Sequence, residues 1–274
     1  MSASPSSSSS PPAGGDGALL SELRAAIDAL SAAPSVLLAF DFDGVLAPIV
    51  EQPGAARSLP ASAASLAALA RVDRVSVALV SGRAMASLRE VADPPDGALL
   101  VASHGAEGDG VPSDLDDEQR ALLARVVEAV RAVADAHEGT HLELKPAGAV
   151  LHTRSAARDA AAEASRLVAD GPGAWEGVRA LRGKEVVELS VVEADKGSAL
   201  VALRDRLAER TGTRPVVLYA GDDVTDEDAF GALEPAAGDV GVKVGDGETA
   251  AEFRVGTPED VSALLQHLVS VLRG

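Results

Sequence analysis

The chain has 274 residues, enough for one large domain or two smaller ones, and 47% of them are hydrophobic, so a sizeable core can form. Its net charge of −18 argues against nucleic acid and anionic membranes as partners. It has no cysteine, which excludes disulfides and thiolate metal sites, and no apolar run approaches the ~20 residues that span a bilayer. We therefore expect a cytoplasmic protein.

Residues 1–17 are rich in Ser and Pro and predict a disordered tail. They lack the basic start and apolar centre of a secretory signal. Aromatic residues make up only 2% of the chain, so the core must consist of Val, Leu and Ala, as suits a parallel sheet between helices. A surface this acidic would repel an anionic substrate unless a divalent ion and local Lys and Arg reversed the charge.

Residues 18–111 alternate between apolar runs of strand length and segments with helical spacing. This rhythm is typical of right-handed βαβ units and predicts a parallel sheet. The expected elements are helix 19–32, strand 36–40, helix 60–72, strand 75–80, helix 84–91 and strand 98–102.

Residues 112–192 break that rhythm and predict a separate, smaller α+β domain inserted into the larger one. Its expected elements are helix 115–136, strands 141–145 and 149–154, helix 156–169, and strands 178–182 and 185–191. The βαβ rhythm resumes in residues 193–274, with helix 196–208, strand 216–220, helix 226–233, strand 240–244 and helix 258–272.

Acidic residues follow two of the predicted buried strands. Asp41, Asp43 and Gly44 come directly after strand 36–40, and a cluster over 222–228 follows strand 216–220. One Asp-x-Asp-Gly fits an ordinary strand-to-turn junction as well as a reactive site. The second cluster favours chemistry, because ligands bind beyond the carboxyl ends of parallel strands. Carboxylates this close need a cation, and oxygen ligands without cysteine favour Mg²⁺.

Four short motifs occur in the order typical of haloacid-dehalogenase-like phosphatases: Asp41-Phe42-Asp43-Gly44, Ser81-Gly82-Arg83, Lys196-Gly197 and Gly221-Asp222-Asp223-x-x-Asp226. The insertion lies where one cap type of that superfamily occurs. Finer features resemble the trehalose-6-phosphate phosphatases: Leu46-Ala47-Pro48-Ile49, His104-Gly105-Ala106-Glu107, Glu143-Leu144-Lys145, His152-x-Arg154, Gly183-Lys184-x-x-x-Glu188 and the continuation Thr225-Asp226-Glu227-x-Ala229-Phe230. The resemblance covers about residues 36–244, and its specificity lies in the ordered set rather than in any single motif.

The resemblance implies a Rossmann-like parallel-sheet core domain with an inserted smaller α+β cap domain. It also implies Mg²⁺-dependent hydrolysis of trehalose 6-phosphate through an aspartyl-phosphate. Asp41 is then the nucleophile, and Asp43 is the general acid and base. Mg²⁺ is held by Asp41, by the backbone carbonyl of Asp43 and by Asp222. Asp223 and Asp226 orient these ligands and their waters.

Ser81, Gly82 and Lys196 are the expected phosphate-binding residues. The alternative for Lys196, a solvated residue at a helix start, is unattractive because a cation there opposes the helix dipole. Arg83 is expected either to contact substrate or to pair with a carboxylate of the cluster. His104 is expected on the substrate side, the alternative being a loop residue satisfied by the backbone.

Glu143 and Lys145 alternate along one predicted strand and therefore share a face. With Glu188 they are expected to bind the second glucose ring, because charged groups bind sugar hydroxyls well. His152 and Arg154 are placed on the partner strand, with Arg154 as a further substrate contact. Without the resemblance, a solvated sheet face is the favoured interpretation of this pattern.

The chain departs from the family pattern at two positions. Val45 replaces a threonine after the first-motif glycine, which removes a hydroxyl near the phosphate. The family commonly has Glu-x-Arg-Pro where this chain has Glu188-Leu189-Ser190-Val191, so the arginine at position 190 is missing.

Two other functions stay open at this stage. One is a phosphatase for a different sugar phosphate, such as sucrose 6-phosphate. The other is a catalytically silent homologue that binds a sugar phosphate or a trehalose-phosphate synthase, although the presence of both Asp41 and Asp43 argues against silence. We expect a small-molecule sugar-phosphate substrate and a monomer, with association to a synthase as a further expectation.

Overall fold

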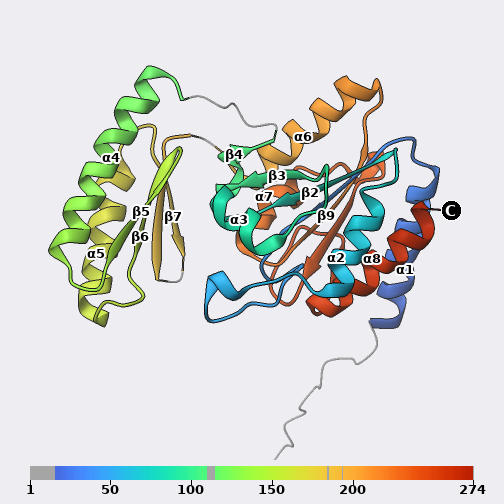
Figure 1. Ribbon diagram of the computed structural model, residues 1–274, viewed down its shortest axis with the longest axis horizontal. Coiled ribbons are helices and arrows are strands. Elements are labelled where there is room, and N and C mark those ends of the chain that lie inside the picture. The colour runs from blue at the N-terminus through green and yellow to red at the C-terminus, as the bar shows by residue number, and fades with distance from the viewer. Residues whose placement is uncertain (1–15, 110–114, 184, 193, 274) are drawn as a thin grey trace, which may run out of the picture.

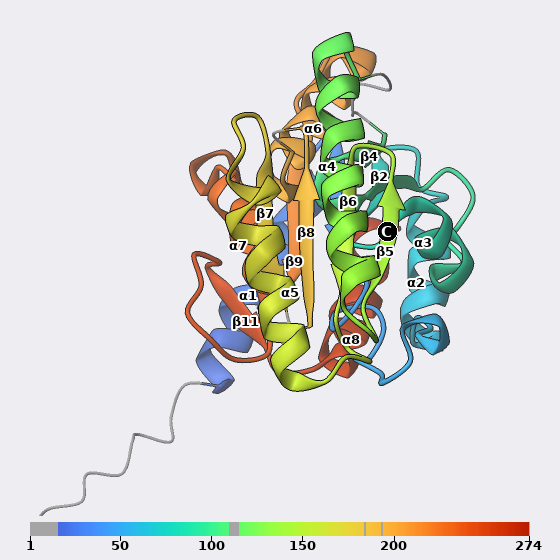
Figure 2. The ribbon, with the colours of Figure 1, turned by 90° about the vertical axis from the view of Figure 1, so that its left-hand side faces the viewer.

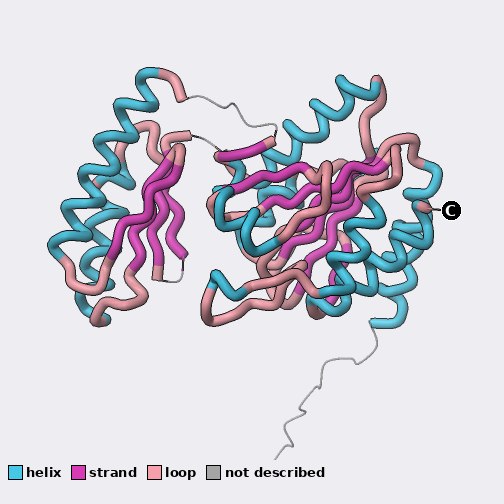
Figure 3. The backbone as a smooth tube through the Cα atoms, viewed as in Figure 1, coloured by secondary structure: helices cyan, strands magenta, loops and turns pink. Residues whose placement is uncertain are grey.

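A computed structural model describes residues 16–109, 115–183, 185–192 and 194–273, which form two units side by side (Figures 1 and 3). The tail expected over residues 1–17 lies outside the described residues except for its last two, which begin the first helix. The expected domain boundaries after residues 111 and 192 adjoin residues that are not described, so they stay predictions. No described helix is long and apolar enough to cross a membrane.

The larger unit, called the core below, is built on a seven-stranded sheet. Neighbouring strands are parallel except β4, which runs antiparallel to β3. In spatial order the strands are β11 (Phe253–Val255), β10 (Val240–Val244), β9 (Val216–Gly221), β1 (Val36–Phe40), β2 (Val75–Val80), β3 (Leu99–Ala102) and β4 (Glu107–Gly108).

Helices cover both faces of this sheet (Figure 1). Leu38 and Phe40 of β1 point into one hydrophobic cluster, which contains side chains from α1 (Asp16–Ala29), α2 (Pro60–Leu69), α3 (Met85–Ala92) and α8 (Pro258–Leu272). Leu37 and Ala39 point into a second cluster, made with α6 (Lys196–Thr211) and α7 (Glu227–Gly231). Burial of β1 on both faces explains its continuous apolar run.

The smaller unit, called the cap below, has a four-stranded antiparallel sheet in the order β5 (His141–Lys145), β6 (Gly148–His152), β8 (Val186–Ser190), β7 (Arg179–Gly183). α4 (Asp117–Ala136) and α5 (Arg158–Asp170) pack on its outer face around a separate apolar cluster (Figure 2). The other face of the sheet is turned toward the core (Figure 1).

The α/β fold class, with a parallel core sheet and an α+β cap, is confirmed. β4 and β11 were not expected, because runs of two and three residues carry too little periodicity. β6 ends at His152, so the expectation that Arg154 lies on this strand is wrong; the chain turns after His152. The helix expected over 226–233 is shorter, because a 3₁₀ turn precedes α7. The described 3₁₀ turns are Leu30–Ala32, Pro53–Ala55, Ser103–Gly105, Pro172–Ala174, Val224–Asp226 and Pro235–Ala237.

Candidate active site

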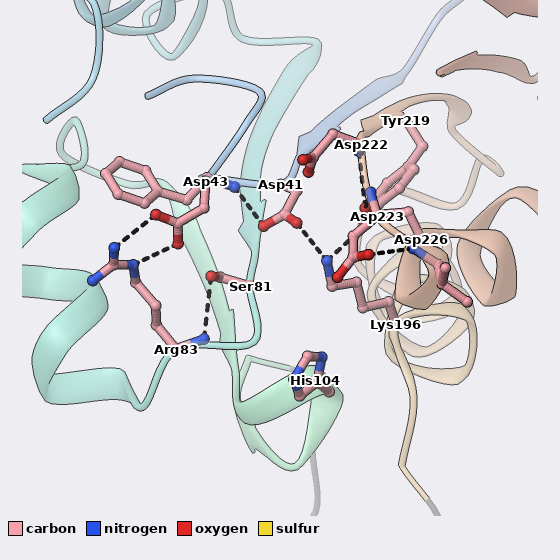
Figure 4. A network of polar contacts seen from close by, with 12 residues as sticks. Asp41, Asp43, Ser81, Arg83, His104, Lys196, Tyr219, Asp222, Asp223 and Asp226 are labelled. Carbon is pink, nitrogen blue, oxygen red and sulfur yellow. Dashed lines mark hydrogen bonds and ion pairs between the residues drawn. The ribbon is translucent and has the colours of Figure 1, made fainter. Parts of the chain in front are cut away.

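The acidic ends of two sheet strands meet at one point. β1 and β9 are adjacent, with Phe40 opposite Ala220, so Asp41 and Asp222 emerge side by side. The ladder continues one residue further, since the Asp41 amide donates to the Ala220 carbonyl at 2.9 Å. Carboxylate oxygens of Asp41, Asp222 and Asp226 all lie within 4.8 Å of one another (Figure 4). The fold therefore brings the two distant acidic motifs together.

Lys196 bridges this cluster from the first residue of α6. Its Nζ lies 2.5 Å from Asp41 Oδ2 and 2.7 Å from Asp226 Oδ1, and its side chain is 1% exposed. Burial alone would lower the pKa of Lys196, but the two carboxylates outweigh it and raise the pKa above its ordinary value. Lys196 is therefore a permanent buried cation. The alternative of a solvated lysine is excluded by this burial.

Asp226 organises the cluster and has no free acceptor position. Its Oδ1 accepts from Lys196 and from the Tyr219 hydroxyl at 2.6 Å. Its Oδ2 accepts from the amides of Asp222 and Asp223 at 2.9 and 2.8 Å. Asp226 thus holds the loop after β9 in place. The Tyr219 contact was not foreseen, because a tyrosine inside an apolar run looks like any core residue.

The carboxylate of Asp222, in contrast, accepts none of the hydrogen bonds among the described residues. It lies against Gly44, whose φ of +73° suits glycine and whose Cβ, if present, would overlap this carboxylate. Burial raises the pKa of Asp222 to about 6, with Asp226 and Asp223 adding to the rise and Lys196 and Lys243 opposing it. A half-buried acid without a partner is what a bound cation would compensate.

The pKa of Asp41, like that of Asp222, is raised above its ordinary value. Burial raises its pKa, Lys196 counteracts this, and Asp226 and Asp222 raise the pKa further. One carboxylate oxygen of Asp41 accepts the Phe42 amide at 2.5 Å. Two adjacent acids, both with raised pKa and both offering oxygen ligands, form a donor set that fits a hard divalent cation. The residues present therefore suit a magnesium site.

Asp43 is turned away from this cluster and toward Arg83 (Figure 4). The guanidinium makes a two-point contact, Nε to Oδ2 and Nη2 to Oδ1, both at 2.6 Å. Its Cζ also lies 5.4 Å from the centre of the Phe42 ring. Of the two readings of Arg83, this structure shows the pairing with a carboxylate.

Ser81 and Gly82 follow β2 and lie beside Asp43 and His104. Ser81 is 1% exposed, and its hydroxyl accepts the Arg83 amide at 3.3 Å. A Cβ at Gly82 would overlap the His104 ring, so glycine is needed for this close approach. Asp223, also expected near the site, is exposed, and its carboxylate caps the following turn by accepting the Val224 amide at 2.7 Å.

His104 is a partly buried imidazole with an unpartnered nitrogen. It and Ser103 both adopt left-handed backbone angles, with φ of 54° and 48°, which non-glycine residues rarely do. Burial lowers the pKa of His104 to about 3, and nearby Lys196 and Lys145 lower it further. Its Nδ1 is buried and has no hydrogen-bond partner. The backbone therefore does not satisfy this ring.

The cap presents charged residues to this site from the open face of its sheet. Lys145 Nζ lies 2.8 Å from Glu188 Oε1 and 3.2 Å from the carbonyl oxygen of Gly82. The other oxygen of Glu188 is 3.7 Å from His104 Nε2. Lys145 and Glu188 thus connect the cap to the core directly over the site.

Glu143 lies on the same face of β5 as Lys145 but is engaged within the cap. Its Oε2 is 2.7 Å from His152 Nε2, and this hydrogen bond is the main reason that the pKa of Glu143 is lowered. Arg154 lies in the turn after β6. It is 61% exposed and contacts Glu185 at 3.1 Å and the Glu51 carbonyl at 2.9 Å.

Two charged residues near the site, Lys243 and Arg179, were not predicted from the sequence. Lys243, inside the apolar strand β10, is 3% exposed and donates to the Asp222 carbonyl at 2.6 Å. A lysine within a run of valines was a signal that could have been followed. Arg179, at the start of β7, reaches the core beside Lys196 and had no such signal. Val45 is fully buried in the core cluster.

The cap is closed on the core in this structure. A pocket between them is lined by residues of both units, yet it leaves only ≈ 20 Å³ for the centre of a water-sized sphere. That is room for about one water molecule and not for a sugar. Its lining includes Ser103, His104, Arg179, Glu188, Asp195 and Lys196.

Comparison with known proteins agrees with this arrangement. Residues 39–258 match the family described as Trehalose-phosphatase. The chain belongs to the trehalose-phosphatase family. Because this family consists of haloacid-dehalogenase-like phosphatases, the chain is a hydrolase. The trehalose-phosphate phosphatase of Mycobacterium marinum is 34% identical over 268 residues, which cover 92% of this chain and 67% of that protein.

Solved structures of the family share the fold. The C-terminal domain of trehalose-6-phosphate phosphatase from C. albicans has a TM-score of 0.73 at 23% identity, covering 90% of this chain and 96% of that one. Trehalose-6-phosphate phosphatase from Aspergillus fumigatus has a TM-score of 0.60 at 27% identity, covering 90% and 97%. The family's core and cap are thus both present in this chain.

Proposed function

We propose that this chain hydrolyses trehalose 6-phosphate to trehalose and phosphate, with Mg²⁺ as cofactor and an aspartyl-phosphate as intermediate. The observation that carries the proposal is the contact of Asp41 with Lys196 beside the unpartnered Asp222. This group of charges lies under a cap face with the polar residues a sugar needs. The mycobacterial relatives, named as trehalose-phosphate phosphatases, support the choice of substrate.

The metal would be held by the carboxylates of Asp41 and Asp222 and by the backbone carbonyl of Asp43. When bound, Mg²⁺ neutralises charge on the phosphate and on the clustered acids. Asp226 is not offered as a ligand, because its acceptor positions are filled by Lys196, Tyr219 and two amides. It orients the loop that carries Asp222.

In the first step an oxygen of Asp41 bonds to phosphorus while the bond from phosphorus to the sugar oxygen breaks. Asp43, as the acid, gives its proton to that oxygen, and trehalose leaves. In the second step a water oxygen attacks the phosphorus of the aspartyl-phosphate, and Asp43 takes the water proton. Phosphate and free Asp41 are regenerated, so the cycle is balanced.

Arg83 positions the Asp43 carboxylate for this role. The two-point ion pair fixes the Asp43 carboxylate outside the metal cluster. To deliver a proton, Asp43 must exchange at least one of these contacts for the leaving oxygen. Arg83 is therefore a positioning residue in this mechanism, rather than the direct substrate contact that was one of its two expected roles.

Lys196, Ser81 and Gly82 would bind the phosphoryl group. Lys196 Nζ contacts Oδ2 of Asp41. Its positive charge therefore already lies beside the carboxylate whose charge changes during phosphoryl transfer. Ser81 offers a hydroxyl, and the backbone at Gly82 lies close to the ring of His104. Because Lys196 stays charged, this attraction persists across the physiological pH range.

Glu143, Lys145 and Glu188 would bind the sugar, with His104 Nδ1 as an added contact from the core. Lys145 and Glu188 form an ion pair with each other in this structure. Both groups can bind sugar hydroxyls instead when the cap opens and recloses. Arg154 is left out of this set, because it lies in the exposed turn after β6 and contacts Glu51.

The experiment is phosphate release from a panel of sugar phosphates, with and without Mg²⁺. The proposal expects trehalose 6-phosphate to be preferred and EDTA to abolish release. Equal rates on sucrose 6-phosphate and trehalose 6-phosphate would refute the substrate assignment while leaving the phosphatase. No release from any member of the panel would favour the silent homologue.

A further inference from the structure

Arg179 is a cap residue that contacts the core next to Lys196. Its Nη1 donates to the carbonyl of Ala194, and its Nη2 lies 3.3 Å from Asp228 Oδ2. Asp195 Oδ2 is 4.0 Å from Nη1. Asp195 itself caps α6 by accepting the Ser198 amide at 2.7 Å. Arg179 therefore holds the residues that immediately precede Lys196.

The strand register places a second residue, Ser190, beside Arg179. Arg179 on β7 is paired directly with Ser190 on β8, so the two side chains project from the same face. Side chains opposite one another on antiparallel strands start only about 5 Å apart. A guanidinium on either strand can therefore reach the same place.

We propose that Arg179 is a positioning residue that seats the cap on the core beside Lys196 through its contacts with Ala194, Asp195 and Asp228. It is 39% exposed, and partly exposed ion pairs are individually weak. A weak contact suits a cap that must release the core to admit each substrate and then return. Arg179 would fix Glu188 and Lys145 at a constant distance from the reacting groups.

The absence of cysteine allows a direct test without substrate. Cysteines placed at the exposed positions Glu163 on α5 and Glu209 on α6 take spin labels, and pulsed electron resonance then gives the distribution of cap-to-core distances. The proposal expects Arg179→Ala to increase the long-distance, open population several-fold. Arg182→Ala is the matched control, because Arg182 lies on the same strand but pairs with Asp170 inside the cap at 2.9 Å.

Two further variants separate the contact from general damage to the cap. Asp228→Asn removes the partner from the core side and should open the cap in the same direction. The exchange Arg179→Ser with Ser190→Arg should restore the closed distribution, because it returns a guanidinium to the same face. Thermal unfolding of each variant shows that it is folded before its distances are compared.

An unchanged distance distribution in Arg179→Ala would overturn the proposal. An exchange variant that is folded but remains open would overturn the claim that a guanidinium on this face of the cap sheet seats the cap. The same opening in Arg182→Ala would show a general effect on the cap and would also overturn it. None of these readouts depends on the identity of the sugar, so they are independent of the proposed function.

Kinetics give a second readout. If the closed fraction falls tenfold, the apparent affinity for a substrate that needs the closed cap falls about tenfold, so KM for trehalose 6-phosphate should rise by that factor. A small aryl phosphate, which makes few cap contacts, should change far less. Equal changes for both substrates would contradict a role through the cap.

Discussion

Asp41 carries the chemistry in this account, and its replacement is the simplest test at the scale of a residue. Asp41→Asn keeps the shape but removes the nucleophile, so turnover should fall by at least about 10³-fold. The fold should persist, because Lys196 keeps its contact with Asp226. Phosphate release and thermal unfolding measure the two effects. Asp135→Asn is the control, because this acid is exposed on α4, which packs on the outer face of the cap sheet.

Lys243 should matter for the metal although it is not a ligand. Its buried ammonium holds the carbonyl of Asp222, so Lys243→Met should release the loop and weaken Mg²⁺ binding roughly 10- to 100-fold, as the loss of groups that orient ligands does. Calorimetric titration with Mg²⁺ measures this, and Lys243→Arg should recover part of the affinity. Equal Mg²⁺ affinity in Lys243→Met and the unmodified protein would show that the contact is only structural.

His104 should make the fold sensitive to acid. Its pKa in the folded protein is about 3, below its ordinary value of 6.5. Between those values the unfolded chain binds a proton that the folded protein does not, so stability falls as pH drops below about 6.5. His104→Asn, which tolerates the left-handed backbone, should lose less stability between pH 7 and pH 5. Melting temperatures at both pH values test this, and parallel losses in both proteins would contradict it.

At the scale of elements, the turn after β1 is the most constrained piece of backbone at the site. Gly44→Ala would force a Cβ onto the Asp222 carboxylate at a positive φ. We expect a loss of about 1–2 kcal/mol of stability and weaker Mg²⁺ binding. Denaturant unfolding and Mg²⁺ titration measure both. Gly54→Ala is the control, because no heavy atom lies near its added Cβ; a similar effect there would refute the steric argument.

The strand ends could be predicted from sequence because buried parallel strands are continuous apolar runs, and β1 and β9 are of this kind. Their adjacency placed Asp41 beside Asp222. The edge strands β4 and β11 could not be predicted, because they are held by pairing rather than by their own pattern. The choice for Arg83 depended on a contact 40 residues away, which no local pattern reveals. The expected strand position of Arg154 was wrong because β6 ends at His152, two residues earlier.

At the scale of the whole molecule, the proposed function divides the work: the cap would supply the sugar contacts and the core the chemistry. Glu188→Gln should therefore harm trehalose 6-phosphate far more than a small aryl phosphate. Its carboxylate bonds to Lys145, and losing a hydrogen bond to a charged group costs about 10- to 100-fold in affinity. Steady-state KM values for both substrates measure this. A uniform loss would place Glu188 in the reaction itself.

The net charge of −18 also acts on the whole molecule. An anionic substrate meets Lys196, Lys145 and Arg179 where the cap and core come together, but each of these cations already pairs with a carboxylate. The divalent ion proposed above would supply the additional positive charge that the phosphate needs. A monomeric state, a cytoplasmic location and association with a synthase stay predictions.

The central claim is that Asp41 receives the phosphoryl group, and chemical trapping tests it most directly. The enzyme is mixed with trehalose 6-phosphate and Mg²⁺, quenched in acid during turnover and treated with borohydride, which reduces an acyl phosphate to an alcohol. Peptide mass spectrometry should then find homoserine at position 41, only when substrate and metal are both present. Rapid phosphate release with position 41 unmodified, or with the modification at another acid, would contradict the account.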